Sequence, residues 1–110
     1  MIRDDNVYLQ DIIESIEMIF EYLGDKTVFE FSQSLLIQDA VFRRFEIIGE
    51  AVSKISPSVK DANPEIEWRL MKLMRNKLIH EYFGVSTETI YNTIHQDLPH
   101  LLNNLKKIEI

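Results

Sequence analysis

Two long segments of the chain repeat apolar residues at intervals of three and four, and this spacing restricts the fold more than any other feature. In residues 4–23 the repeated positions are Leu9, Ile12, Ile16, Ile19 and Leu23. In residues 34–55 they are Ile37, Val41, Phe45, Ile48, Val52 and Ile55. Because an α-helix turns once in about 3.6 residues, each set forms an apolar stripe along one side. The segments therefore predict two amphipathic helices.

Shorter segments rich in turn-forming residues separate the predicted helices. Gly24 is a natural end for the first helix, and residues 24–33 are expected to form a short link to the second. Residues 56–65 contain two prolines and are expected to form a loop. A third helix is expected to open at Pro64 or Glu65 and to end near Gly84.

The C-terminal part also has helical spacing. Residues 85–89, with the sequence VSTET, offer a Ser or Thr N-cap for a fourth helix. Pro99 is expected at a kink or in the first turn of a last helix. The apolar positions that keep the period there are Ile94, Leu98, Leu101, Leu105 and Ile108. No alternating strand pattern occurs, so the expected fold is all-α, a bundle of four to five helices, mostly antiparallel because the links are short.

Composition narrows the class of protein. The 110 residues suit a single domain, residues 1–110, with one modest core. The absence of cysteine excludes disulfides and thiolate metal sites, and neither a signal peptide nor an apolar span is recognisable, so a cytoplasmic location is expected. A formal net charge of −6 argues against a generic nucleic-acid binder, which usually has a global basic excess, and suits a basic protein partner instead.

An arginine interrupts the apolar stripe of the third predicted helix. At about 100° per residue, Arg75 lies within the arc that holds Trp68 and Met71. A buried guanidinium cannot lose its proton, so it needs an anion, a ring of carbonyls or a wet cleft. The simplest interpretation is a structural ion pair with Glu46 or Glu50 on the second helix.

A second arc of the same helix, about 80° wide, carries hydrogen-bond donors: Arg69, Lys72, Asn76 and His80. This set suits the contacts that proteins make with a phosphate backbone. It is also what an ordinary solvated face looks like, and spacing alone favours that simpler interpretation. His80 lies about 140° from Arg75, so the two side chains meet at one small site only if the helix loosens or a second subunit contributes.

The stretch RNKLIHEY, residues 75–82, matches an R-x4-H-x-Y motif, and here the chain resembles the HEPN-domain proteins. More narrowly, it is similar to the HepT-like toxins that are paired with a small nucleotidyltransferase antitoxin of the MntA type. The stretches QDAVFRRFEIIGEA and PEIEWRLMKLMRNKLIHEYFGV carry the likeness further, in the order and at the separation found in that family. The resemblance covers about residues 36–85.

The resemblance implies a HEPN-type helical homodimer with the two motif helices facing one another across a cleft. The implied activity is ribonuclease action on cellular RNA without a metal ion or another cofactor. Arg75 and His80 would be the catalytic pair, and Asn76 the polar residue beside them. Arg69 and Lys72 are further candidates for RNA binding, on the strength of their place in the donor arc. Tyr82 would be the tyrosine that the antitoxin modifies with AMP.

Two other interpretations compete with the ribonuclease. The chain could be a non-enzymatic helical dimer that binds a nucleotidyltransferase or a nucleotide, with Arg75 and His80 as phosphate ligands, or a purely structural bundle. A zinc helix is excluded at this motif, because H-E-x-x-H would require histidine where Gly84 stands. His95 and His100 have poor spacing for metal ligands and are expected at the surface.

Overall fold

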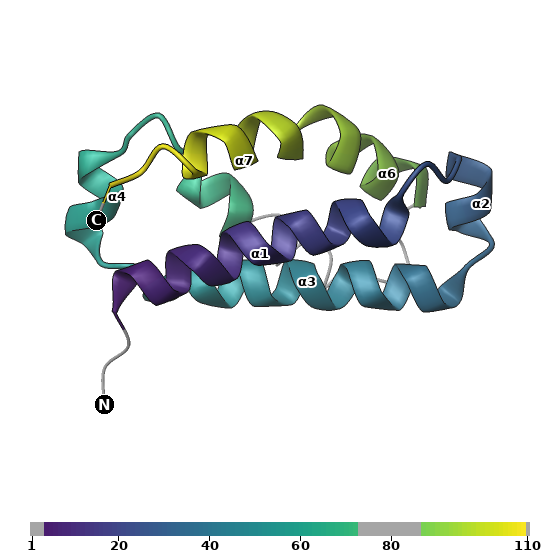
Figure 1. The fold of residues 1–110 in the computed structure, drawn as a ribbon, viewed down its shortest axis with the longest axis horizontal. Coiled ribbons are helices and arrows are strands. Elements are labelled where there is room, and N and C mark those ends of the chain that lie inside the picture. The colour runs from purple at the N-terminus through teal and green to yellow at the C-terminus, as the bar shows by residue number, and fades with distance from the viewer. Residues whose placement is uncertain (1–3, 73–86, 110) are drawn as a thin grey trace.

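A computed structural model describes residues 4–72 and 87–109 of the chain. All regular secondary structure in these ranges is helical, as the spacing predicted. The molecule is elongated, 41 × 26 × 24 Å, and its long helices run parallel to the long axis (Figure 1). No helix among these residues is long and apolar enough to cross a membrane.

The first helix, α1, spans Asp5–Leu23 and is capped at both ends. The Asp4 side chain accepts a hydrogen bond of 2.9 Å from the Asn6 amide, which satisfies one of the free N–H groups of the first turn. At the other end Gly24 takes φ +54°, a conformation that side chains with a Cβ rarely adopt. Its amide donates to the Phe20 carbonyl at 2.8 Å and closes the helix, as expected from the sequence.

The third helix, α3, spans Leu35–Lys54 and packs antiparallel against α1 (Figure 1). The Ser34 side chain caps it by accepting from the Ile37 amide at 3.2 Å. The two apolar stripes meet along this pair of helices, so that every predicted stripe residue of α1 is buried, and so is every one of α3 except the half-buried Ile37.

The last two helices cover the other side of α1. Helix α6 spans Thr87–Gln96 and α7 spans Leu98–Leu105, one continuing the direction of the other (Figure 1). Pro99 stands in the first turn of α7, where its missing N–H would have had no helical partner. The buried side chains of this pair are Ile94, Leu98, Leu101 and Leu105.

Two short helices lie where the sequence predicted a link and a loop. Helix α2 spans Val28–Ser32, and a capping box holds its start: Thr27 Oγ1 accepts from the Glu30 amide, and the Thr27 amide donates to Glu30 Oε1. The bond from the Thr27 amide lowers the pKa of the Glu30 carboxyl below its ordinary value. The expectation of a simple link was wrong because five residues are too few to show a period.

Helix α4 spans Pro57–Ala62, with proline at its first position, so the predicted loop was also wrong. The chain then turns through residues 63–67 and becomes helical again at residue 68, three or four residues later than the predicted start at Pro64 or Glu65. The turn residues bond among themselves instead, since the Ile66 amide donates to the Asn63 carbonyl at 3.1 Å.

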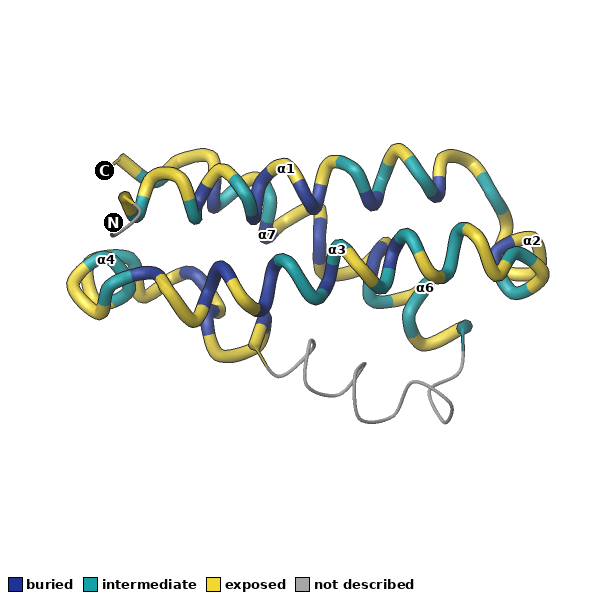
Figure 2. Tube along the Cα trace, turned by 90° about the horizontal axis from the view of Figure 1, so that it is seen from below, coloured by how far each residue is buried: buried dark blue, intermediate teal, exposed yellow. Residues whose placement is uncertain are grey.

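The buried apolar side chains form one connected core along the axis of the bundle. Figure 2 shows buried positions recurring on the inward sides of α1 and α3. Phe31 of α2 closes one end of this core and is completely buried, with its ring 6.3 Å from that of Tyr91 on α6. The Tyr91 hydroxyl donates to the Lys26 carbonyl at 2.9 Å, which further ties α6 to the α1–α2 connection.

Asp5 joins the start of α1 to the end of α3. Its Oδ2 accepts from Ser56 Oγ at 2.6 Å and its Oδ1 from the Ser56 amide at 2.8 Å. These two bonds hold the pKa of the Asp5 carboxyl below its ordinary value. Because the folded-state pKa is the lower one, the stabilisation is present above the unfolded-state pKa, which is about 3.9 in model peptides. It is lost as pH falls through the folded-state pKa.

We therefore expect Asp5→Asn to lower the melting temperature at pH 7 and to reduce the loss of stability between about pH 5 and pH 2. Thermal unfolding followed by circular dichroism at a series of pH values measures both effects. Asp61→Asn, at an exposed carboxyl on α4, is the matched control. If the melting temperature fell equally steeply with acid pH in wild type and in Asp5→Asn, the stabilising role given to the Asp5 carboxylate would be wrong.

Ser15 is an unusual buried residue of α1. Its side chain is 0% exposed, and its hydroxyl makes no hydrogen bond within the described structure. An unpaired buried hydroxyl costs about 1–3 kcal/mol, and alanine is also the better helix former. We expect Ser15→Ala to raise the free energy of unfolding by about 1 kcal/mol in urea denaturation. Ser53→Ala, at an exposed position of α3 where the hydroxyl donates to the Glu50 carbonyl at 2.7 Å, is the comparison; an equal gain there would show that burial is irrelevant.

Candidate nucleic-acid site

The helical residues 68–72 lead directly into the R-x4-H-x-Y motif, and their rotation is set by Trp68. The indole is 9% exposed, and its Nε1–H donates to the Asn63 carbonyl at 3.1 Å. Met71 is also buried, at 1% exposed, three residues further on. These two side chains turn one side of the helical segment toward the core, in agreement with the predicted apolar stripe.

On the other side of this helical segment, Arg69 and Lys72 are exposed. Arg69 borders a shallow depression of the surface whose lining residues are Lys60, Asp61, Ile66, Glu67, Trp68, Arg69 and Leu70. The cations Lys60 and Arg69 could meet phosphate oxygens there, although two carboxylates share the same lining. The exposure of Arg69 and Lys72 was predicted; their contact with RNA stays a prediction.

The predicted site residues within the motif lie outside the described residues: Arg75, Asn76, His80 and Tyr82. The predicted ion pair of Arg75 with Glu46 or Glu50 therefore also lies outside them. Of the two carboxylates expected to pair with that arginine, Glu46 is half-buried and Glu50 is exposed.

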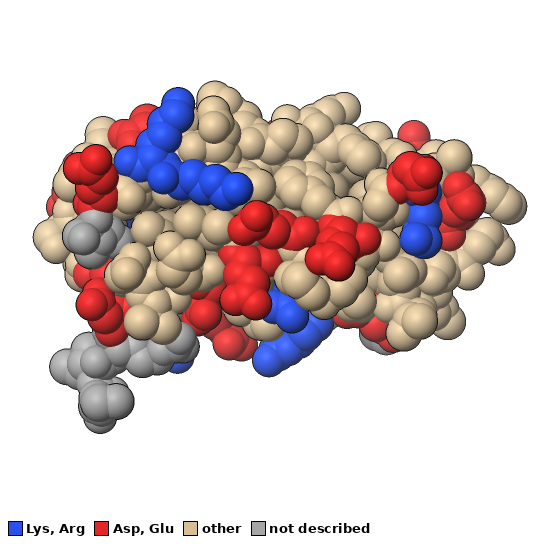
Figure 3. Space-filling view, viewed as in Figure 1, with Lys and Arg blue, Asp and Glu red and all other residues tan. Residues whose placement is uncertain are grey.

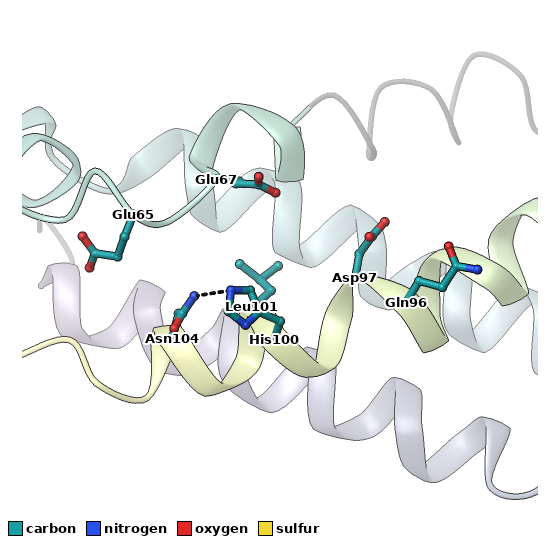
Figure 4. Close-up of a pocket in the computed structure, with 7 residues that line it drawn as sticks. All are labelled: Glu65, Glu67, Gln96, Asp97, His100, Leu101 and Asn104. Carbon is teal, nitrogen blue, oxygen red and sulfur yellow. Dashed lines mark hydrogen bonds between the residues drawn. The ribbon is translucent and has the colours of Figure 1, made fainter.

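A second hollow, of about 230 Å³, lies beside the turn that precedes residue 68 (Figure 4). Glu65 and Glu67 line it from the turn, and five residues of α6, α7 and their junction line it from below: Gln96, Asp97, His100, Leu101 and Asn104. One ring nitrogen of His100, Nε2, lies 3.1 Å from Asn104 Nδ2. Sequence spacing did not reveal this hollow, because its two sides are about thirty residues apart.

The chemistry of this hollow does not suit phosphate. The carboxylates of Glu65, Glu67 and Asp97 would repel an RNA backbone. Within the described ranges no group of three or more His, Asp or Glu side chains is placed to hold a metal ion. His95 and His100 are both exposed, as expected, and the centroid of the His95 ring lies 4.4 Å from that of Tyr91, with the two ring planes tilted by 58°.

The face of the molecule formed by α1 is acidic. Figure 3 shows Asp and Glu side chains gathered over the middle of this face, with Lys and Arg at the upper left, at the lower edge and near the right end of the view. Glu14, Glu17 and Glu21 are exposed on α1, and of these Glu17 has Lys106 Nζ at 3.5 Å. Nucleic acid would be repelled from this face.

Comparison with known proteins identifies relatives along almost the whole chain. The family model described as "Ribonuclease HepT-like" matches residues 12–108. The chain is 42% identical over 108 residues to "Probable ribonuclease HepT" of Thermococcus cleftensis, covering 98% of each protein. It is also 41% identical over 108 residues to "Gamma-glutamylcyclotransferase and putative RNase MJ0434" of Methanocaldococcus jannaschii. That match covers 98% of this chain but only 49% of the relative, which is about twice as long. No solved structure matches the chain.

Proposed function

The chain belongs to the ribonuclease HepT-like family, and from this premise we propose that it is a metal-independent endoribonuclease toxin that cleaves cellular RNA in the cytoplasm. The observation that carries the proposal is the complete R-x4-H-x-Y motif, residues 75–82, inside a family match that covers residues 12–108. The exposed Arg69 and Lys72, within two turns before the motif, support it by supplying positive charge close to it in the sequence.

The residue types suit cleavage without a metal ion. The 2′-hydroxyl of RNA attacks the adjacent phosphorus, the bond to the 5′-oxygen breaks, and a 2′,3′-cyclic phosphate forms. One proton leaves the 2′-oxygen and one arrives at the 5′-oxygen, and histidine, with an ordinary pKa of about 6.5, can accept or donate it. In this proposal His80 transfers protons, Arg75 holds the charged phosphorane with its two-pronged guanidinium, and Asn76 orients the phosphate.

The proposal includes a homodimer. Arg75 and His80 are about 140° apart around an ideal helix, so one copy of the helix cannot aim both at one phosphate. Two motif helices across a two-fold axis remove this difficulty, because the arginine of one subunit can face the histidine of the other. Two His80 rings could then divide the roles of acid and base.

The proposed regulator is a small nucleotidyltransferase of the MntA type that acts as antitoxin. The phenol oxygen of Tyr82 would attack the α-phosphorus of ATP and release pyrophosphate, which leaves AMP attached through a phosphodiester. The added bulk and negative charge would repel RNA phosphates from the neighbouring Arg75 and His80. Tyr82 stands two residues after His80 in the sequence, close enough for this effect.

Cleavage of RNA by the purified chain in EDTA tests the proposal. We expect wild type to cut with EDTA present and to leave cyclic phosphate ends, and His80→Ala to be slower by about a hundredfold or more, with an unchanged melting temperature. Mass spectrometry must first show that Tyr82 is unmodified. Equal rates for the two proteins would remove His80 from the mechanism, and cleavage by neither would favour the non-enzymatic binding module.

A further inference from the structure

Four exposed apolar side chains gather at one end of the molecule, where α2 meets α3. Of the six large apolar residues that are exposed in the described structure, Val28, Phe29, Leu35 and Leu36 fall within nine positions of the sequence. Leu36 is 78% exposed, Leu35 72% and Phe29 68%. We call these four residues the α2–α3 corner. Single exposed apolar residues are ordinary, but a cluster of this kind is typical of an interaction site.

The fold holds the corner in this exposed arrangement. Phe31 points into the core, and Phe29, two residues earlier, is about 200° away around the helix and so points outward. Helix α2 is fixed to α3 because Gln38 Nε2 donates to the carbonyls of Phe31 and Ser32 at 2.9 and 3.2 Å. Leu35 opens α3 directly after its cap. The corner is therefore a built surface rather than the side of a loose loop.

Charged side chains adjoin the corner in the sequence. The carboxylates Asp25, Glu30 and Asp39 are exposed, and the neighbouring cations are the half-buried Lys26 and the exposed Arg43, so the acidic charges outnumber the basic ones by one. The rim would repel RNA and anionic lipid. It would also oppose a second copy of the chain, because an isologous contact brings the same carboxylates together. The complementary surface is that of a protein with apolar side chains at the centre and Lys or Arg around them.

The corner also lies at the end of the bundle where α6 begins. Helix α6 begins at Thr87 beside α2, and the Tyr91 and Phe31 rings pack together there (Figure 1). Tyr82 is five residues before Thr87 in the sequence, and five residues span at most about 18 Å along any path. A protein docked at this end would therefore have Tyr82 within a short tether of its contact surface.

We propose that the α2–α3 corner is the docking surface for the nucleotidyltransferase that modifies Tyr82, and that the docking face of this partner is apolar with a basic rim. The inference rests on the proposed function for the identity of the partner. The apolar centre and the charged rim should affect different steps of binding. The centre should slow the dissociation of the complex, and the rim should raise its association rate and make binding depend on salt.

Isothermal titration calorimetry of the purified chain with the nucleotidyltransferase tests this surface. We expect the double variant Leu35→Glu, Leu36→Glu to bind at least a hundredfold more weakly and to be modified more slowly at Tyr82. Its cleavage of RNA without the partner should equal that of wild type. Glutamates suit the first turn of a helix, so α3 should still form. Val7→Glu, at a 40% exposed position of α1, is the matched control and should bind normally.

A second variant keeps the test decisive if the double variant does not fold. Phe29→Ala removes an exposed ring and should weaken binding about tenfold, and raising NaCl from 50 to 300 mM should weaken the binding of wild type. If both corner variants bound the nucleotidyltransferase with wild-type affinity, the corner would not be the docking surface, although the two proteins would still be partners. No binding by wild type would overturn the partner itself, and cleavage in EDTA would still report separately on the ribonuclease.

Discussion

Replacing Arg75 with alanine is expected to slow RNA cleavage by about a hundredfold to a thousandfold, the usual cost of losing one donor to a developing negative charge. The reason is that arginine stays protonated at every stage and binds two phosphate oxygens at once. Arg75→Lys keeps the charge but loses the planar fork, so we expect it to recover only part of the rate. Single-turnover cleavage of a short RNA at saturating protein measures the chemical step.

Arg69→Ala is the matched control, because Arg69 precedes the motif by less than two turns and is exposed. Loss of a phosphate contact outside the reacting group should weaken binding of all RNA sequences alike and reduce its salt dependence, with little effect on the saturated rate. If Arg69→Ala reduced the saturated rate and Arg75→Ala did not, the roles proposed for the two arginines would be wrong.

Replacing Phe31 with alanine is expected to lower the free energy of unfolding by about 3–5 kcal/mol, the largest stability effect that we expect from one side chain. Phe31 is completely buried, and its ring packs on Tyr91 where α2 meets α6. Its loss leaves a cavity at the end of the core and frees α2, which has no other buried residue. Urea denaturation followed by circular dichroism measures the change.

Phe29→Ala, two residues earlier in the same short helix, removes the same ring from a 68% exposed position. We expect it to change the free energy of unfolding by less than about 0.5 kcal/mol. The pair separates burial from helix propensity, because both substitutions make the same chemical change in α2. Similar losses for the two variants would mean that the corner is packed in solution and is no free surface.

The long helices could be predicted because their burial repeats along the chain. The stripes of α1 and α3 each cover several turns, and a repeated period is hard to mistake. The end of α1 at Gly24 and the place of Pro99 in the first turn of α7 also followed from local chemistry. These features depend on residues close in sequence, so the sequence was enough.

The short elements could not be read from a period. Helix α2 buries only Phe31, and the described α4 buries no residue, so neither shows a stripe. The capping box of Thr27 and Glu30 was the available signal for α2, and Ser-Pro at residues 56 and 57 was the signal for α4. Ser56 does not cap α4 with its side chain because its hydroxyl bonds to Asp5, a partner distant in sequence.

The candidate site was predictable only in part. The exposure of Arg69 and Lys72 followed from the burial of Trp68 on the same helical segment. The family, shown by the match to residues 12–108, is a property of the sequence as well. The roles of Arg75, Asn76, His80 and Tyr82 stay predictions that cleavage and modification experiments must test.

What the sequence by itself determined is which segments form the long helices, which of their sides face the core, and which family the chain belongs to. Tertiary structure alone decided which distant residues become neighbours: the acidic hollow between Glu65 and His100, and the apolar corner beside the start of α6. The physical reason is range. Helical periodicity is written in residues three and four apart, whereas a surface is assembled from side chains that only the packing of helices brings together.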